Sequence, residues 1–244
     1  MTKETTTEYG RLIVGKREEL FAKAVELAVE RQGRAGAKAF TLALTGGSTP
    51  QEWYRWCVKG QKLPEAFLRA THFTVSDERC VPLHSEQSNF GNAQRQLLEP
   101  LQVAPAQHHP WPVEKLPVEA AAAYARDWQE RVGEGRAFDV CFLGMGDDGH
   151  TASIFPGSEL LKGDGGRLFT AIDVPGKGWR LTITPTGLAA CGLIVIMTLG
   201  AAKAAMLKRI FTGAHEPMQT PVQLVHDWRE RAVWLVDDAA AAGV

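Results

Sequence analysis

The sequence has little of the cysteine chemistry on which small metal-binding and redox domains depend. Its four cysteines are far apart, and no two of them form a C-x-x-C pair. Zinc ribbons and thioredoxin-like centres need such pairs, so the sequence favours neither class. Three of the four lie in or beside apolar segments, which is typical of buried, reduced thiols in a cytosolic protein. The four are Cys57, Cys80, Cys141 and Cys191.

Long apolar runs and an excess of one charge are also lacking. No stretch reaches the roughly 18 apolar residues that span a bilayer, and the first 20 residues lack the apolar core of a secretory signal. The chain has 27 Lys and Arg residues against 28 Asp and Glu residues, a net charge of −1. A nucleic-acid surface needs a concentrated positive excess. We therefore expect a cytoplasmic protein that contacts neither membrane nor nucleic acid, with no obligate protein partner evident.

What the chain does contain is an alternation of short apolar runs and helix-like segments. Of its 244 residues, 45% are hydrophobic and 23% charged, as in ordinary globular proteins. Apolar runs without polar alternation, interleaved with helices, indicate a mostly parallel sheet covered on both faces. We predict one domain, 1–244, with a three-layer α/β/α, Rossmann-like fold. The expected strands are 39–45, about 72–75, 138–145, 167–174, 180–185, 192–200 and 232–237, and the expected helices are 16–34, 51–60, 90–101, 118–132 and 201–211.

The first strand end with a candidate binding motif is LTGGSTP, residues 44–50, which is followed by an expected helix. In such folds ligands collect beyond the carboxyl ends of the strands. Thr49 is expected as the helix N-cap, with Glu52 completing a capping box. Free N–H groups behind glycines at a helix start suit a phosphate, although a purely structural turn is the alternative. The candidate phosphate contacts are the backbone amides of Gly46, Gly47 and Ser48.

The second strand end is SDER, residues 76–79. Arg79 can donate two parallel hydrogen bonds to a phosphate or carboxylate. Asp77 or Glu78 could orient that guanidinium or contact substrate hydroxyls, and Asn89, ten residues further on, could add a neutral group. The alternative is a solvated run of charges.

The third strand end is the glycine-rich turn GMGDDGH. Gly144, Gly146 and Gly149 predict a sharp, exposed turn, but their spacing does not complete G-x-G-x-x-G. His150 is a natural general base near neutral pH, and Asp148, two residues earlier, could set its tautomer. No second His or Cys stands nearby, so we expect no metal site. A surface histidine in a polar turn is the alternative.

The fourth strand end, GAAK, places Lys203 in the first turn of a helix. A cation there opposes the helix dipole, which is better explained by an anionic ligand than by helix stability. Arg180, which opens RLTITP, is a further cationic candidate.

These motifs together resemble the 6-phosphogluconolactonase family. LTGGSTP, SDERCVP, the SN pair at 88–89, GMGDDGHTASIFPG, RLTITP and GAAK occur in the family's order from about residue 40 to 235. Two departures are small: Thr45 stands where Ser is usual, and Asp147 where Pro or Glu is common.

The resemblance implies hydrolysis of 6-phospho-D-glucono-1,5-lactone to 6-phosphogluconate, with no metal or organic cofactor. His150 would be the general base that activates water. Arg79 and Lys203 would anchor the phosphate, with Arg180 and the glycine-turn amides of the first strand end as further contacts. Backbone amides of the 144–149 turn are candidates for stabilising the oxyanion.

Two alternatives stay open. The related glucosamine-6-phosphate isomerases/deaminases also carry a DGH turn, but they have Tyr where this chain has Arg79 and a carboxylate where it has Phe155. A non-enzymatic sugar-phosphate sensor would need a DNA-binding module, and the sequence shows no helix-turn-helix pattern or basic excess.

Overall fold

A seven-stranded, mostly parallel sheet forms the centre of the molecule. The computed structural model describes residues 2–35 and 39–244. All neighbouring strands of this sheet are parallel except the first pair, which confirms the predicted fold class. In spatial order the strands are β1 (Lys3–Thr7), β2 (Gly10–Gly15), β10 (Ala232–Asp237), β9 (Ile194–Thr198), β6 (Val140–Leu143), β3 (Phe40–Leu44) and β4 (Thr71–Val75).

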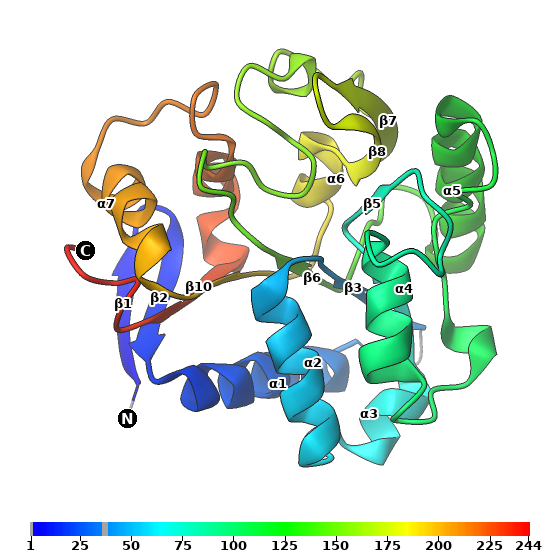
Figure 1. The fold of residues 1–244 in the computed structure, drawn as a ribbon, viewed down its shortest axis with the longest axis horizontal. Helices are drawn as coiled ribbons and strands as arrows, with labels where there is room; N and C mark the ends of the chain where they lie inside the picture. The colour runs from blue at the N-terminus through cyan, green and yellow to red at the C-terminus, as the bar shows by residue number, and fades with distance from the viewer. Residues whose placement is uncertain (1, 36–38) are drawn as a thin grey trace.

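Helices cover both faces of this sheet. In Figure 1, α1 and α2 lie below it, and α6 and α7 lie above it. Strands β3, β6, β9 and β10 are buried along their whole length, which explains their unbroken apolar sequences. The helices are α1 (Arg17–Gly33), α2 (Ser48–Lys59), α3 (Glu65–Ala70), α4 (Asn89–Ala93) continued by a π-helical turn (Gln94–Leu98), α5 (Pro117–Val132), α6 (Pro185–Ala189) and α7 (Ala204–Thr212).

Three further strands form a separate antiparallel sheet. It consists of β5 (Asp77–Arg79), β8 (Gly178–Ile183) and β7 (Phe169–Val174), in that spatial order. The sequence predicted β7 and β8 as strands but assigned them to the parallel sheet. The β7–β8 hairpin lies above the central sheet, beside α5 (Figure 1).

The amino-terminal hairpin was not predicted. Strand β1 is KETTT, almost wholly exposed, so it offers no apolar alternation that would indicate a strand. It forms because all five of its residues pair with β2. A 3₁₀-helical segment, Pro221–Arg231, which is kinked at Trp228, was likewise not predicted.

The parallel strands bring four loops to one edge of the sheet. Strands β9, β6, β3 and β4 are consecutive neighbours, so the segments after their carboxyl ends lie side by side. These segments are 199–203, 144–152, 45–48 and 76–79, the four strand ends that the sequence singles out. The side chains of these four segments are held in position, because each segment directly follows a buried strand.

Candidate active site

A polar cleft opens at this edge of the sheet. Its cavity volume is about 190 Å³. It gathers six of the predicted site residues from three different strand ends and from the start of α4. The lining residues are Thr45, Gly46, Gly47, Asp77, Arg79, Asn89, Gly144, Met145, Gly146, His150 and Ala152.

The imidazole of His150 is held by Asp148. Nδ1 of His150 lies 2.5 Å from Oδ1 of Asp148, and the His150 backbone N–H donates to the same oxygen at 3.1 Å. Burial acts to raise the pKa of Asp148, but these hydrogen bonds outweigh it and the pKa is lowered. The carboxylate therefore stays ionised and accepts a hydrogen bond from the N–H at Nδ1, which leaves Nε2 as the unprotonated, basic nitrogen.

Glycine is required in the turn that carries this pair. A Cβ on Gly146 would lie 2.0 Å from Nδ1 of His150, so any side chain there would displace the ring. Gly149 has a φ of +78°, in the left-handed region that favours glycine. The turn is closed by hydrogen bonds from the Gly146 N–H to the His150 carbonyl and from the Gly149 N–H to the Gly146 carbonyl.

An aromatic ring covers one face of the imidazole. The rings of His150 and Phe155 are stacked, with centroids 4.2 Å apart and planes at 27°. The ammonium group of Lys177, in the β7–β8 turn, lies 5.4 Å from the Phe155 centroid. The position five residues after the histidine is thus filled by a packed aromatic side chain that makes no hydrogen bond to the imidazole.

The glycine turn before α2 is open to an anion. Helix α2 begins at Ser48, with Gly47 as its N-cap at φ +106°, and no side chain in the described part of the chain caps it. The expected Thr49–Glu52 capping box is wrong, because Thr49 already lies inside the helix and Glu52 pairs instead with Arg17 at 2.6 Å. The uncapped N–H groups at this helix start remain available, as an anion site requires.

Two arginines lie side by side next to the cleft. Arg79 and Arg180 are directly opposite one another in the β5–β8 ladder. Arg79 lines the cleft and donates to the carbonyl of Gln87 at 2.6 Å, whereas Arg180 donates to carbonyls of its own strand and is not a lining residue. Burial and the adjacent charge of Arg79 lower the pKa of Arg180. A bound anion would relieve this repulsion between like charges.

Lys203 has a partner that the sequence analysis did not assign. Its Nζ lies 2.5 Å from Oδ1 of Asp147, in the same turn as His150. Lys203 ends a short 3₁₀ helix (Ala201–Lys203) that precedes α7, and it is not among the lining residues of the cleft. The unfavourable position of a cation at a helix start is therefore offset by Asp147, and an anionic ligand is not needed to explain it.

Asp77 and Asn89 form the polar floor of the cleft. Oδ2 of Asp77 accepts a hydrogen bond from the hydroxyl of Ser153 at 2.6 Å, and Nδ2 of Asn89 donates to the Asp77 carbonyl at 2.8 Å. Oδ1 of Asn89 is buried and has no hydrogen-bond partner among the described residues. A Cβ on Gly46 would come within 1.9 Å of this oxygen. Ser153 was not predicted as a site residue, because its partner Asp77 is 76 residues away in the sequence.

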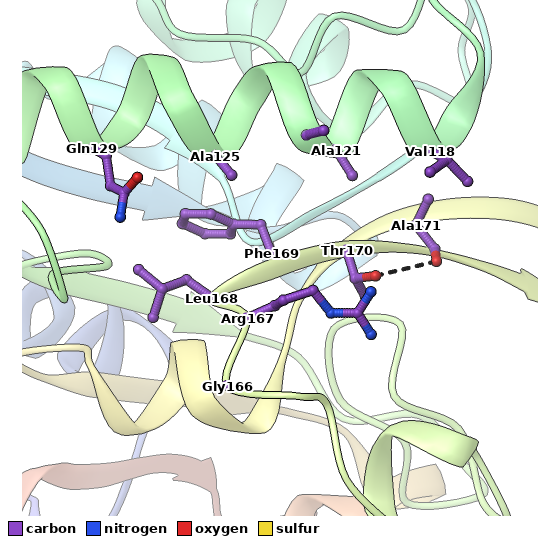
Figure 2. A pocket seen from close by; sticks show the side chains of 11 residues that line it. Val118, Ala121, Ala125, Gln129, Gly166, Arg167, Leu168, Phe169, Thr170 and Ala171 are labelled. Carbon is purple, nitrogen blue, oxygen red and sulfur yellow. Dashed lines mark hydrogen bonds between the residues drawn. The ribbon is translucent and has the colours of Figure 1, made fainter.

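A second, larger hollow lies apart from the cleft. It has a cavity volume of about 370 Å³ and lies between α5 and β7. Figure 2 shows Val118, Ala121 and Ala125 of the helix facing Phe169 and its neighbours on the strand. Arg167 is its one charged lining residue. Its lining includes no Asp, Glu or His side chain that could act as a general base next to this arginine. We therefore assign the catalytic site to the smaller cleft.

Among residues 2–35 and 39–244, no group of three or more His, Cys, Asp or Glu side chains is arranged to hold a metal ion. No helix in the same part of the chain is long and apolar enough to cross a bilayer.

Comparison with known proteins identifies the family of this chain. Residues 15–234 match the family described as glucosamine-6-phosphate isomerases/6-phosphogluconolactonase. A 6-phosphogluconolactonase of Nostoc sp. is 32% identical over 235 residues, which cover 94% of this chain and 93% of the relative. The structure of 6-phosphogluconolactonase from Trypanosoma cruzi has a TM-score of 0.81 at 26% identity, covering 98% of both chains. A monomeric glucosamine-6-phosphate deaminase shares the fold, with a TM-score of 0.78 at 16% identity, covering 96% of this chain and 99% of the deaminase. The chain belongs to the glucosamine-6-phosphate isomerase/6-phosphogluconolactonase family.

Proposed function

We propose that this protein hydrolyses 6-phospho-D-glucono-1,5-lactone to 6-phospho-D-gluconate, a step of the oxidative pentose phosphate pathway. The observation that carries the proposal is the His150–Asp148 pair at a cleft that also contains Arg79. The pair supplies a base, and the arginine supplies a charge complementary to phosphate. The relatives named above support the same activity.

In the proposed reaction, Nε2 of His150 takes a proton from a water molecule. The water oxygen attacks the lactone carbonyl carbon, and the carbonyl becomes a tetrahedral oxyanion. When the intermediate collapses, the bond to the ring oxygen breaks, and the protonated imidazole returns its proton to that oxygen. Asp148 stabilises the imidazolium that exists between the two steps. A lactone is an activated ester, so no covalent nucleophile is needed.

The phosphate of the substrate is proposed to lie among the cations and the open helix start. Arg79 would contact it directly, with Arg180 beside it and the amides of Gly46, Gly47 and Ser48 as further donors. Lys203 would contribute after leaving Asp147. Asp77 would accept hydrogen bonds from the sugar hydroxyls, and Asn89 would accept hydrogen bonds from them or donate hydrogen bonds to them. Hydrogen bonds that form only as the oxyanion develops would come from backbone amides of the 144–149 turn other than those of Gly146 and Gly149, which close the turn.

Isomerisation or deamination of glucosamine-6-phosphate is the second candidate, because a deaminase shares the fold. Phe155 argues against it. The isomerases carry a carboxylate at this position, which completes a relay with the histidine, whereas here a phenyl ring is stacked on the imidazole. A sugar-phosphate sensor has no comparable supporting observation.

The predicted cytoplasmic location and the absence of nucleic-acid, membrane and obligate protein partners stay predictions of the sequence.

The deciding experiment compares two assays on the same preparation. Freshly generated 6-phosphogluconolactone is added to the purified protein, and its decay is followed by proton release against buffer alone. In parallel, glucosamine-6-phosphate is supplied and ammonia is measured. We expect acceleration in the first assay only, unchanged by chelators. Lactone decay at the buffer rate would reject the proposal, and release of ammonia would favour the second candidate.

A further inference from the structure

A buried carboxylate lies directly behind the cleft. Glu78, in the middle of β5, has no exposed surface, so the predicted contact of this side chain with substrate hydroxyls is wrong. Its two oxygens accept four hydrogen bonds from neutral donors. The donors are the backbone N–H groups of Arg79 (2.8 Å), Asn89 (2.7 Å) and Phe90 (2.8 Å) and the hydroxyl of Ser88 (2.9 Å).

One oxygen of this carboxylate joins two residues that line the cleft. Oε1 accepts from the N–H groups of both Arg79 and Asn89. These residues belong to different elements, the strand β5 and the start of α4, and both line the cleft. Glu78 therefore links the backbone of a proposed phosphate ligand to that of a proposed hydroxyl ligand, in addition to the hydrogen bond from Asn89 Nδ2 to the Asp77 carbonyl.

Capping of α4 accounts for only part of this arrangement. Ser88 caps the Gly91 N–H at 2.9 Å, and Glu78 accepts from the N–H groups of Asn89 and Phe90 in the same first turn, but Glu78 also accepts from the Arg79 N–H, which belongs to β5. Burial raises the pKa of Glu78, although its hydrogen bonds oppose the shift. Burying an ionisable group in this way is costly unless its hydrogen bonds compensate, and a neutral side chain could not accept from four donors at once.

We propose that Glu78 is a positioning residue for substrate, acting through the backbone of Arg79 and Asn89. The inference rests on the proposed function, because it assumes that both residues bind the phosphorylated lactone. Substitution of Glu78 should therefore weaken substrate binding, while the His150–Asp148 pair, held by its own turn, keeps its geometry.

Glu78→Gln tests this with little change of shape. The amide places an N–H group against backbone N–H donors, so at least one of the four hydrogen bonds is lost. We expect KM for the lactone to rise about tenfold or more, since small displacements of binding groups are costly, with a much smaller change in kcat. The dissociation constant of 6-phosphogluconate should rise by a similar factor, and the pH profile of kcat should not move.

Asp164→Asn is the matched control. Asp164 is also a buried carboxylate that accepts hydrogen bonds from backbone N–H groups. The donors are Gly166 and, at the start of α6, Thr186. It is not a lining residue of the cleft. Its substitution should lower the melting temperature, as Glu78→Gln also should, but leave KM unchanged.

The outcomes are distinct. Wild-type protein without lactonase activity would overturn the proposed function. Active wild-type protein with an unchanged KM in Glu78→Gln would overturn the positioning role alone, as would an equal rise of KM in Asp164→Asn. If Glu78→Gln does not fold, Glu78→Asp, which withdraws the carboxylate by one methylene, is measured by the same criteria.

Discussion

Phe155 and His150 form a stacked pair, 4.2 Å between ring centroids, on the edge of the cleft. The imidazole of His150 also lies against the backbone of Gly146, so closely that a Cβ at position 146 would clash with the ring. The ring is therefore fixed by packing as well as by its hydrogen bond to Asp148. Such fixing matters for a general base, which must stay within reach of the water that it activates.

Replacing Phe155 by Leu should lower kcat about two- to tenfold, the range expected from the loss of an aromatic pair worth 0.5–1.5 kcal/mol. KM should change little, because Phe155 does not line the cleft. Steady-state kinetics of lactone hydrolysis measure both constants. Phe155→Tyr keeps the stack and serves as the control; a wild-type kcat in the leucine variant would remove Phe155 from the positioning of His150.

His150→Ala should lower kcat by about 10²–10⁴-fold, the usual contribution of a general base. Asp148→Asn should cause a smaller loss, since the ring keeps its stack but no longer its carboxylate. Because its hydrogen bonds to His150 lower the pKa of Asp148, this carboxylate stays ionised down to a lower pH than an ordinary aspartate. A near-normal rate in His150→Ala would assign the base elsewhere.

The elements that the sequence predicted well are those whose pattern is local. Unbroken apolar runs predicted the buried parallel strands, and the motifs after them predicted the cleft residues, because parallel strands end at one edge. Strand β1 was missed because KETTT carries no apolar signal and depends on its partner. The pairing of Arg79 with Arg180, the Asp147–Lys203 ion pair and the contacts of Glu78 join segments that only the tertiary structure brings together.

Arg79→Ala and Arg180→Ala should both raise KM for the lactone. A lost charge-assisted hydrogen bond of 1.5–3 kcal/mol corresponds to about 10- to 150-fold, and we expect the larger effect for Arg79, which lines the cleft. The effects should not be additive in the double variant, because the two residues are neighbours. Arg69→Ala, on α3 and paired with Glu65, is the control. A change confined to kcat would contradict a role in phosphate binding.

Asp147→Asn should lower KM by up to about fivefold, because a surface ion pair of 0.2–1 kcal/mol no longer competes with the substrate for Lys203. Lys203→Met should raise it. Asp127→Asn, on the exposed face of α5, removes the same charge at a distance and corrects for long-range electrostatics. If Asp147→Asn matches Asp127→Asn and Lys203→Met matches wild type, Lys203 is not a phosphate ligand.

The stability of the protein should depend on a histidine pair remote from the cleft residues. Nε2 of His109 lies 2.7 Å from Nδ1 of His72, at the edge strand β4. Burial, and then the positive charge of Arg131, lower the pKa of His109 to about 4, and burial also lowers the pKa of His72. Between about pH 6.5, the ordinary value for histidine, and pH 4, the unfolded chain binds more protons than the folded one.

The free energy of unfolding should therefore fall as the pH falls through this window, and these histidines should add no pH dependence above it. His109→Gln removes the larger of the two contributions. Melting temperatures from pH 7.5 to 4 should decline less steeply in this variant than in wild type, whereas His84→Gln, at an exposed position, should follow the wild-type slope. Carboxylates that titrate in the same range affect all three proteins alike, so only the difference in slope reports on the pair. Parallel curves for His109→Gln and wild type would mean that His109 is protonated as easily in the folded protein as in the unfolded chain.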